Sequence, residues 1–276
     1  MKTVLILLDQ SDAAEALLNY ASRFVKDLSF ERVLLLQTCY RPIYSQIFCS
    51  VDFVQLSAEQ LAEEKTHIQD ELKVRAEKLQ HEIGAGIKVE YIVSSLPLLR
   101  SLHQANSEFD PRLVMMGFNP DLQSGFIGSQ IIELVKSSSV SVLVVPQQTS
   151  YLPIRQALVP IDFSSVSEHI LVDNLKRLEA LDLELKVLNV DQTDEQSKDR
   201  SEHEQRLKQL LREFDHKLYY VDHESVVKGI LEFASVHQPE LIIGLPGKHS
   251  FFYRLRHSSI TKALTLNAYR PVLVLK

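Results

Sequence analysis

The chain has 276 residues, 45% of them hydrophobic and 24% charged, and its net charge is −6. This composition is typical of a globular protein that is long enough for one large domain or two small ones. The acidic balance argues against a general nucleic-acid or membrane-surface binder, because such proteins need a basic face, and no apolar run reaches the roughly 18 to 20 residues of a membrane span.

Strand and helix patterns alternate along the chain. The first apolar run is typical of a strand and not of a signal peptide, because it turns acidic at once and lacks a small-residue cleavage site. Capping-box patterns at 57–60 and 165–168 indicate helix starts. One helical face carries Leu61, Ile68, Leu72, Leu79 and Ile83. The strands are expected at about 3–8, 32–38, 87–93, 112–116, 141–145, 156–161, 184–190, 217–221, 239–243 and 271–275.

The continuously apolar strands and the alternation with helices predict an α/β fold. Strands of this kind are buried on both faces, so we expect a mostly parallel sheet with helices on either side. Connections in such sheets are right-handed. Ligands bind at the carboxyl ends of the strands, where the strand order reverses.

The chain contains an internal repeat. Residues 1–19 match 154–175, since each has an apolar strand, an Asp, a serine-containing turn and an amphipathic helix. Residues 112–146 match 240–276 in the same way, from a strand and a Gly to a closing Val-rich strand. The repeat predicts two domains, a first half at 1–148 and a second half at 152–276. The joint at 146–153 is polar and flanked by prolines, as is typical of a linker.

The closing strands of the two halves, 142–145 and 272–275, would each leave an apolar sheet edge exposed. Such an edge favours aggregation. We therefore predict that these two strands pair antiparallel across a pseudo-two-fold axis, so that one chain mimics a dimer.

Residues 39–56 have no counterpart in the second half and are rich in apolar side chains. They are interpreted as a flap over the strand ends or the other half, or alternatively as a lid over a ligand or a docking surface for a partner protein. The two cysteines, Cys39 and Cys49, fit no metal or redox spacing. Two thiols in a chain of this size suggest a reducing cytoplasm.

These features together resemble a tandem member of the universal stress protein family, over nearly the whole chain. The resemblance rests on three features that occur in each half. They are the Asp after the first strand (Asp9 and Asp162), the strand-to-Gly turn (Gly117 and Gly244) and the small pair that opens the last helix (Gly128–Ser129 and Ser258–Ser259). It implies two five-stranded parallel sheets of order 3-2-1-4-5, and dimerisation through the last strands. Nucleotide-binding members carry a signature of Gly, two residues, Gly, nine residues, and Gly followed by Ser or Thr.

The first half departs from this signature and is predicted to be a degenerate site. Gly117 is kept, but Pro120 replaces the second Gly, and the loop to Gly128–Ser129 is shortened. Pro120 removes an N–H donor. The loop holds Asp121 and no cation, so a triphosphate there would meet the wrong charge.

The second half lies closer to the signature, because Gly244 and Gly247 are both present. It departs in two ways, since ten residues and not nine follow Gly247, and Ser258 replaces the third Gly. Glycines let the backbone approach phosphate oxygens, and a helix start attracts an anion. Asp162 would accept a hydrogen bond from the ribose or the adenine edge, or else cap the next helix. The predicted binding set is Pro160, Ile161, Asp162, Gly244, Gly247, Lys248, Arg254, Arg256, Ser258 and Ser259.

The sequence therefore favours a stress protein that binds ATP or AMP in its second half. No metal is predicted beyond a Mg²⁺ ion that would accompany ATP. The alternative is a regulatory protein of the same fold that acts through 39–56 and the interface between halves. Asp222, His223 and Glu224 are adjacent, and neighbours rarely converge on one ion, so we predict no protein-built metal site there and expect Ser225 or Glu224 to open a helix. No nucleophile with an adjacent base is evident, so we predict no enzyme beyond weak ATP hydrolysis. Homodimer formation stays open.

Overall fold

The structure is a computed structural model. It describes residues 2–40, 58–119, 130–161, 172, 175–176, 182–191, 200–245 and 270–276, without the side chains of 58–61 and 200–203. The predicted insertion beyond residue 40 lies outside this part of the chain, as does the capping-box segment at 165–168. None of the described helices is long and apolar enough to cross a membrane.

The strands of the first half form where Val, Leu and Ile run continuously. All six residues of β1 are buried, as a strand covered on both faces requires. The strands are β1 (Thr3–Leu8), β2 (Arg32–Thr38), β3 (Lys88–Ser94), β4 (Leu113–Phe118) and β5 (Val142–Pro146).

The second half repeats this series. Its strands are β6 (Gln156–Pro160), β7 (Glu184–Asp191), β8 (His216–Asp222), β9 (Leu241–Gly244) and β10 (Val272–Val274). Neighbouring strands within each half run parallel.

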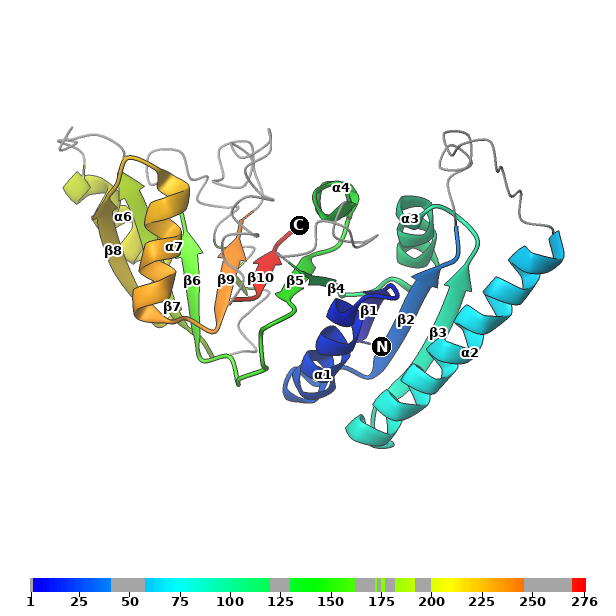
Figure 1. The fold of residues 1–276 in the computed structure, drawn as a ribbon. Helices are drawn as coiled ribbons and strands as arrows, with labels where there is room; N and C mark the ends of the chain where they lie inside the picture. The colour runs from blue at the N-terminus through cyan, green and yellow to red at the C-terminus, as the bar shows by residue number, and fades with distance from the viewer. Residues whose placement is uncertain are drawn as a thin grey trace, which may run out of the picture.

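All ten strands form one twisted sheet in the order β3-β2-β1-β4-β5-β10-β9-β6-β7-β8 (Figure 1). Each half has the expected order 3-2-1-4-5, and the halves meet where β5 pairs antiparallel with β10. Leu143 lies opposite Leu273 at the centre of this pairing. The prediction that the closing strands join the two halves is confirmed.

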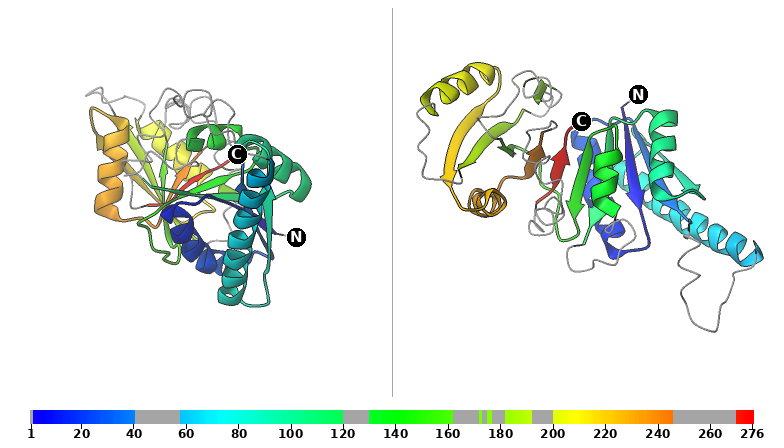
Figure 2. Two further views of the ribbon diagram at one scale, coloured as in Figure 1. Left: turned by 45° about the vertical axis from the view of Figure 1, so that its right-hand side comes forward. Right: turned by 90° about the horizontal axis from the view of Figure 1, so that it is seen from above.

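Helices cover both faces of the sheet (Figure 2). On one face α1 (Asp12–Asp27), α2 (Ala58–Ile83) and α6 (Arg200–Leu210) bury a single apolar cluster that includes residues of both halves. On the other face α3 (Leu98–Phe109), α4 (Ile131–Ser137) and α7 (Val226–His237) bury a second cluster. The predicted stripe of α2 faces the first cluster, since Leu72, Leu79 and Ile83 belong to it. Ile68 of the same stripe is also buried.

The segment that joins the halves is anchored on α1 by Tyr151. Its hydroxyl donates a hydrogen bond to Asp27 Oδ2 at 2.5 Å, and its ring meets Tyr20 edge-on, with 5.1 Å between the ring centroids. Burial raises the pKa of the Tyr151 hydroxyl, and the hydrogen bond to Asp27 raises this pKa further. Although 146–153 is polar overall, one aromatic side chain ties it to the first half. The boundaries at 148 and 152 stay predictions.

Candidate functional site

In each half the strand order reverses between the first and fourth strands. In the first half β1 and β4 are parallel neighbours, with Leu7 opposite Met116. In the second half β6 and β9 are parallel neighbours, with Leu158 opposite Ile242. The carboxyl ends of each pair therefore lie at one edge of the sheet, where ligands of such folds bind.

At the first edge, Asp9 supports the start of a helix. Its Oδ1 accepts hydrogen bonds from the Ser11 backbone N–H at 3.0 Å and from the Ser11 hydroxyl. Ser11 is the N-cap of α1, so the carboxylate fixes the turn by which the chain enters this helix. The sequence left two roles open for the matching Asp162, a ligand contact or support for the start of the next helix. Asp9 takes the second of these roles.

Gly117 is required by packing. A Cβ added to it would lie 2.7 Å from the carbonyl oxygen of Ala13, in the first turn of α1. Only a residue without a side chain lets the helix start pass so close to β4. The glycine that the family signature suggested as a phosphate contact therefore has a packing role in this half.

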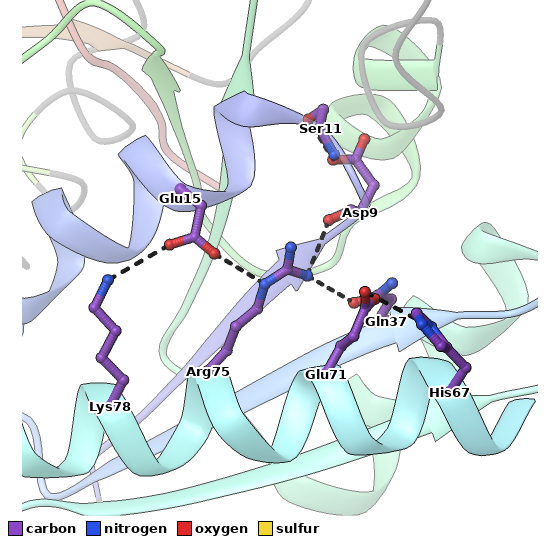
Figure 3. Close-up of polar contacts among 8 residues, drawn as sticks. All are labelled: Asp9, Ser11, Glu15, Gln37, His67, Glu71, Arg75 and Lys78. Carbon is purple, nitrogen blue, oxygen red and sulfur yellow. Dashed lines mark hydrogen bonds and ion pairs between the residues drawn. The ribbon is translucent and has the colours of Figure 1, made fainter.

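The first edge also contains a cation that the sequence reasoning missed (Figure 3). The Arg75 guanidinium donates from Nε to Glu15 Oε1 at 3.0 Å, and from Nη1 to the Asp9 carbonyl and to Gln37 Oε1, both at 3.4 Å. The Arg75 side chain is 18% exposed, and Gln37 is buried. Lys78 Nζ lies 3.7 Å from Glu15 Oε2.

A signal for Arg75 does exist in the sequence. It stands three residues after Leu72 and four before Leu79, and therefore within the apolar stripe of α2. A charged residue in such a stripe must point toward the sheet and find polar partners there. The loop with Asp121 contains no cation in its sequence, and it lies outside the described part of the structure. Arg75 on α2 nevertheless supplies a cation to this edge, and Glu15 is its counter-ion.

The second edge is described only at its base. The Ile161 backbone N–H donates to the Leu188 carbonyl at 2.9 Å, and the Gly244 carbonyl accepts from the Leu275 N–H at 2.9 Å. Pro160, Ile161 and Leu245 are buried. The structure thus brings Pro160 and Ile161 to the same edge as Gly244. The remaining predicted residues lie outside the described part, namely Asp162, Gly247, Lys248, Arg254, Arg256, Ser258 and Ser259, together with Gly128 and Ser129 of the first half.

The end of β8 opens a helix, as expected. Ser225 is the N-cap of α7 and accepts from the Lys228 backbone N–H. The His223 Nδ1 accepts from the Ser225 backbone N–H at 2.8 Å, and the Nε2 lies 3.5 Å from Glu232. Among the described residues, no group of three or more His, Cys, Asp or Glu is placed to hold a metal ion. Cys39 is a free thiol, whose Sγ donates to the Ser94 carbonyl at 3.3 Å.

Known structures share this architecture along the whole chain. A universal stress protein from Archaeoglobus fulgidus DSM 4304 superposes with a TM-score of 0.69 and 15% identity, over 99% of this chain and 96% of that one. A putative universal stress protein from Pseudomonas aeruginosa UCBPP-PA14 superposes with a TM-score of 0.58 and 14% identity, over 100% of this chain and 93% of that one. The cytoplasmic domain of a prokaryotic cation chloride cotransporter superposes with a TM-score of 0.52 and 14% identity, over 99% of this chain and 94% of that one.

At these identities the structural matches show the fold alone. A search of curated protein sequences finds no match. The sequence model of the universal stress protein family matches residues 1–146, which is more than half of the chain. The chain therefore belongs to the universal stress protein family.

Proposed function

We propose that the protein binds an adenine nucleotide, ATP or AMP, at the carboxyl edge of its second half. The observation that carries this proposal is the parallel pairing of β6 with β9 at the point where the strand order reverses. Asp162 follows directly after Ile161, and the Gly–x–x–Gly of Gly244 and Gly247 begins at the last residue of β9. The two segments with nucleotide-binding chemistry thus leave the sheet from neighbouring strand ends.

The residue types of the second half fit the parts of a nucleotide. Gly247 would let backbone N–H groups reach phosphate oxygens. The three cations Lys248, Arg254 and Arg256 would balance the phosphate charge in a chain that is acidic overall. Asp162 would accept a hydrogen bond from a ribose hydroxyl or from the adenine. Mg²⁺, if it accompanies ATP, would be held mainly by the phosphates.

The first half is proposed to bind no nucleotide. Its Asp9 carboxylate already holds Ser11, and its Arg75 guanidinium is already paired with Glu15. The close contact that an added Cβ would make with Ala13 accounts for Gly117. In this proposal the first half serves as the partner that completes the sheet.

The test is calorimetry of the full chain with ATP and with adenosine. Reversing a charge near the polyphosphate, by Arg254→Glu or Arg256→Glu, should cost on the order of 1–3 kcal/mol. This cost corresponds to roughly five- to a hundredfold in the affinity for ATP, with little change for adenosine. Gly247→Val should abolish ATP binding, and Asp162→Ala should weaken both ligands alike.

The matched control is Asp9→Ala, the same change at the repeat-related position of the first half. It should leave the affinity for ATP unchanged. An equal loss of affinity for ATP in Asp9→Ala and Asp162→Ala would show that both halves take part in binding. If the unmodified protein binds no adenine nucleotide at millimolar concentration, the proposal is wrong, and a regulatory role of the fold takes its place.

A further inference from the structure

A cavity of about 800 Å³ lies below the β5–β10 pair, on the side of the sheet that carries α1. Its lining includes none of the described residues of the two candidate nucleotide edges. Its wall is built from buried apolar side chains of both halves, among them Phe24, Phe30, Leu113, Leu143, Leu241 and Leu273. The cavity therefore belongs to the interface between the halves.

The lining of the cavity carries an excess of positive charge. Among the described lining residues, Lys2, Arg112 and Lys276 carry the positive charge, and Glu31 is the only acidic side chain. Glu31 is engaged, since its Oε2 accepts from the Lys2 backbone N–H at 3.1 Å. The Lys2 ammonium donates to the Leu28 carbonyl and lies 5.1 Å from the centroid of the Phe30 ring.

Arg112 differs from the other cations. It is exposed at the start of β4, and within the described part of the chain its guanidinium has no hydrogen-bond or ion-pair partner. Lys276 is partly buried, and this burial lowers the pKa of its amine. An anion in the cavity would give Arg112 a partner and would favour the charged form of Lys276.

The size and lining match a small-molecule site better than a docking surface for a protein. Pockets for small ligands span about 300–1,000 Å³, are mostly apolar, hold a few polar groups and often lie between domains.

We propose that this cavity binds a straight-chain carboxylate, with the alkyl chain between α1 and the β5–β10 pair and the carboxylate at Arg112. A planar guanidinium pairs with a carboxylate through two parallel hydrogen bonds, which fixes the orientation of the ligand. The site is separate from the proposed nucleotide site, and neither proposal depends on the other.

Calorimetry of the full chain with octanoate, octanol and acetate tests this assignment. Octanoate should bind, octanol should bind on the order of tenfold more weakly because it lacks the charge, and acetate should not bind because it lacks the chain. Arg112→Gln should reduce the affinity for octanoate to that for octanol. Arg100→Gln is the matched control, because Arg100 is an exposed arginine on α3, which packs on the other face of the sheet.

A second variant tests the chain-binding part. Leu28 lines the cavity and is partly buried, so Leu28→Trp places a larger side chain where the alkyl chain would lie. This variant should lose octanoate binding while it still unfolds cooperatively on heating, which shows that it is folded. The proposal is overturned if octanoate does not bind, if octanol binds equally well, if Arg112→Gln behaves like Arg100→Gln, or if folded Leu28→Trp binds octanoate as the unmodified protein does.

Discussion

Gly117→Ala should destabilise the protein because of a single added methyl group. The new Cβ would lie 2.7 Å from the carbonyl oxygen of Ala13 and 3.2 Å from its carbonyl carbon. Both atoms belong to the backbone, so only a shift of α1 away from β4 relieves the clash. Overpacking of this kind costs about 1–3 kcal/mol. At about 2–4 °C per kcal/mol for a chain of this size, the melting temperature should fall by roughly 2–12 °C.

Gly86→Ala is the control, because a Cβ at Gly86 meets nothing within 4 Å. Its free energy of unfolding should stay within about 0.5 kcal/mol of that of the unmodified protein. Urea denaturation followed by far-ultraviolet circular dichroism measures both variants. If Gly117→Ala is as stable as Gly86→Ala, the close approach of α1 does not account for this glycine, and a ligand-facing role returns.

Three further predictions concern stability, and urea denaturation measures each of them. Tyr151→Phe removes the hydrogen bond to Asp27 and should cost about 1.5–3 kcal/mol, the range for bonds to charged groups. The folded state raises the pKa of Tyr151 above its usual value of about 10. The stability that its protonated form contributes is therefore fully present below pH 10 and is lost as the pH rises further. This loss of stability at alkaline pH should be smaller in Tyr151→Phe. Asp9→Ala removes the support for Ser11 and should cost about 0.5–2 kcal/mol, whereas an unchanged stability would contradict the role given to this carboxylate. Leu273→Ala opens a cavity where the halves pair and should cost about 2–5 kcal/mol, and a loss below 1 kcal/mol would show that this contact contributes little.

The sheet could be predicted from sequence almost completely. Each expected strand agrees with an observed strand to within two residues at either end. The reason is physical, because a strand buried on both faces needs an unbroken apolar run, and such a run is visible without any long-range information. The pairing of β5 with β10 followed from the cost of leaving two apolar edges exposed.

The candidate site could be predicted only in part. Arg75 reaches the first edge from a helix more than sixty residues after Asp9, and its partners are set by how α2 packs on the sheet. The anchor from Tyr151 to Asp27 spans 124 residues. The packing role of Gly117 depends on where α1 crosses β4. A local sequence pattern shows which residue types are present. It does not give the distances between elements that are remote in sequence, on which these three findings depend.

The covalent joining of the two halves has a consequence for how the protein can evolve. In a homodimer every substitution appears twice, so both edges change together. Here the strands that meet, β5 and β10, belong to one chain. A substitution can therefore change the candidate site at the edge of one half while the residues at the edge of the other half stay the same. The short connection also holds the halves at a high effective concentration. The β5–β10 contact should therefore survive dilution that would separate two independent subunits, so the sheet tolerates divergence that weakens this contact.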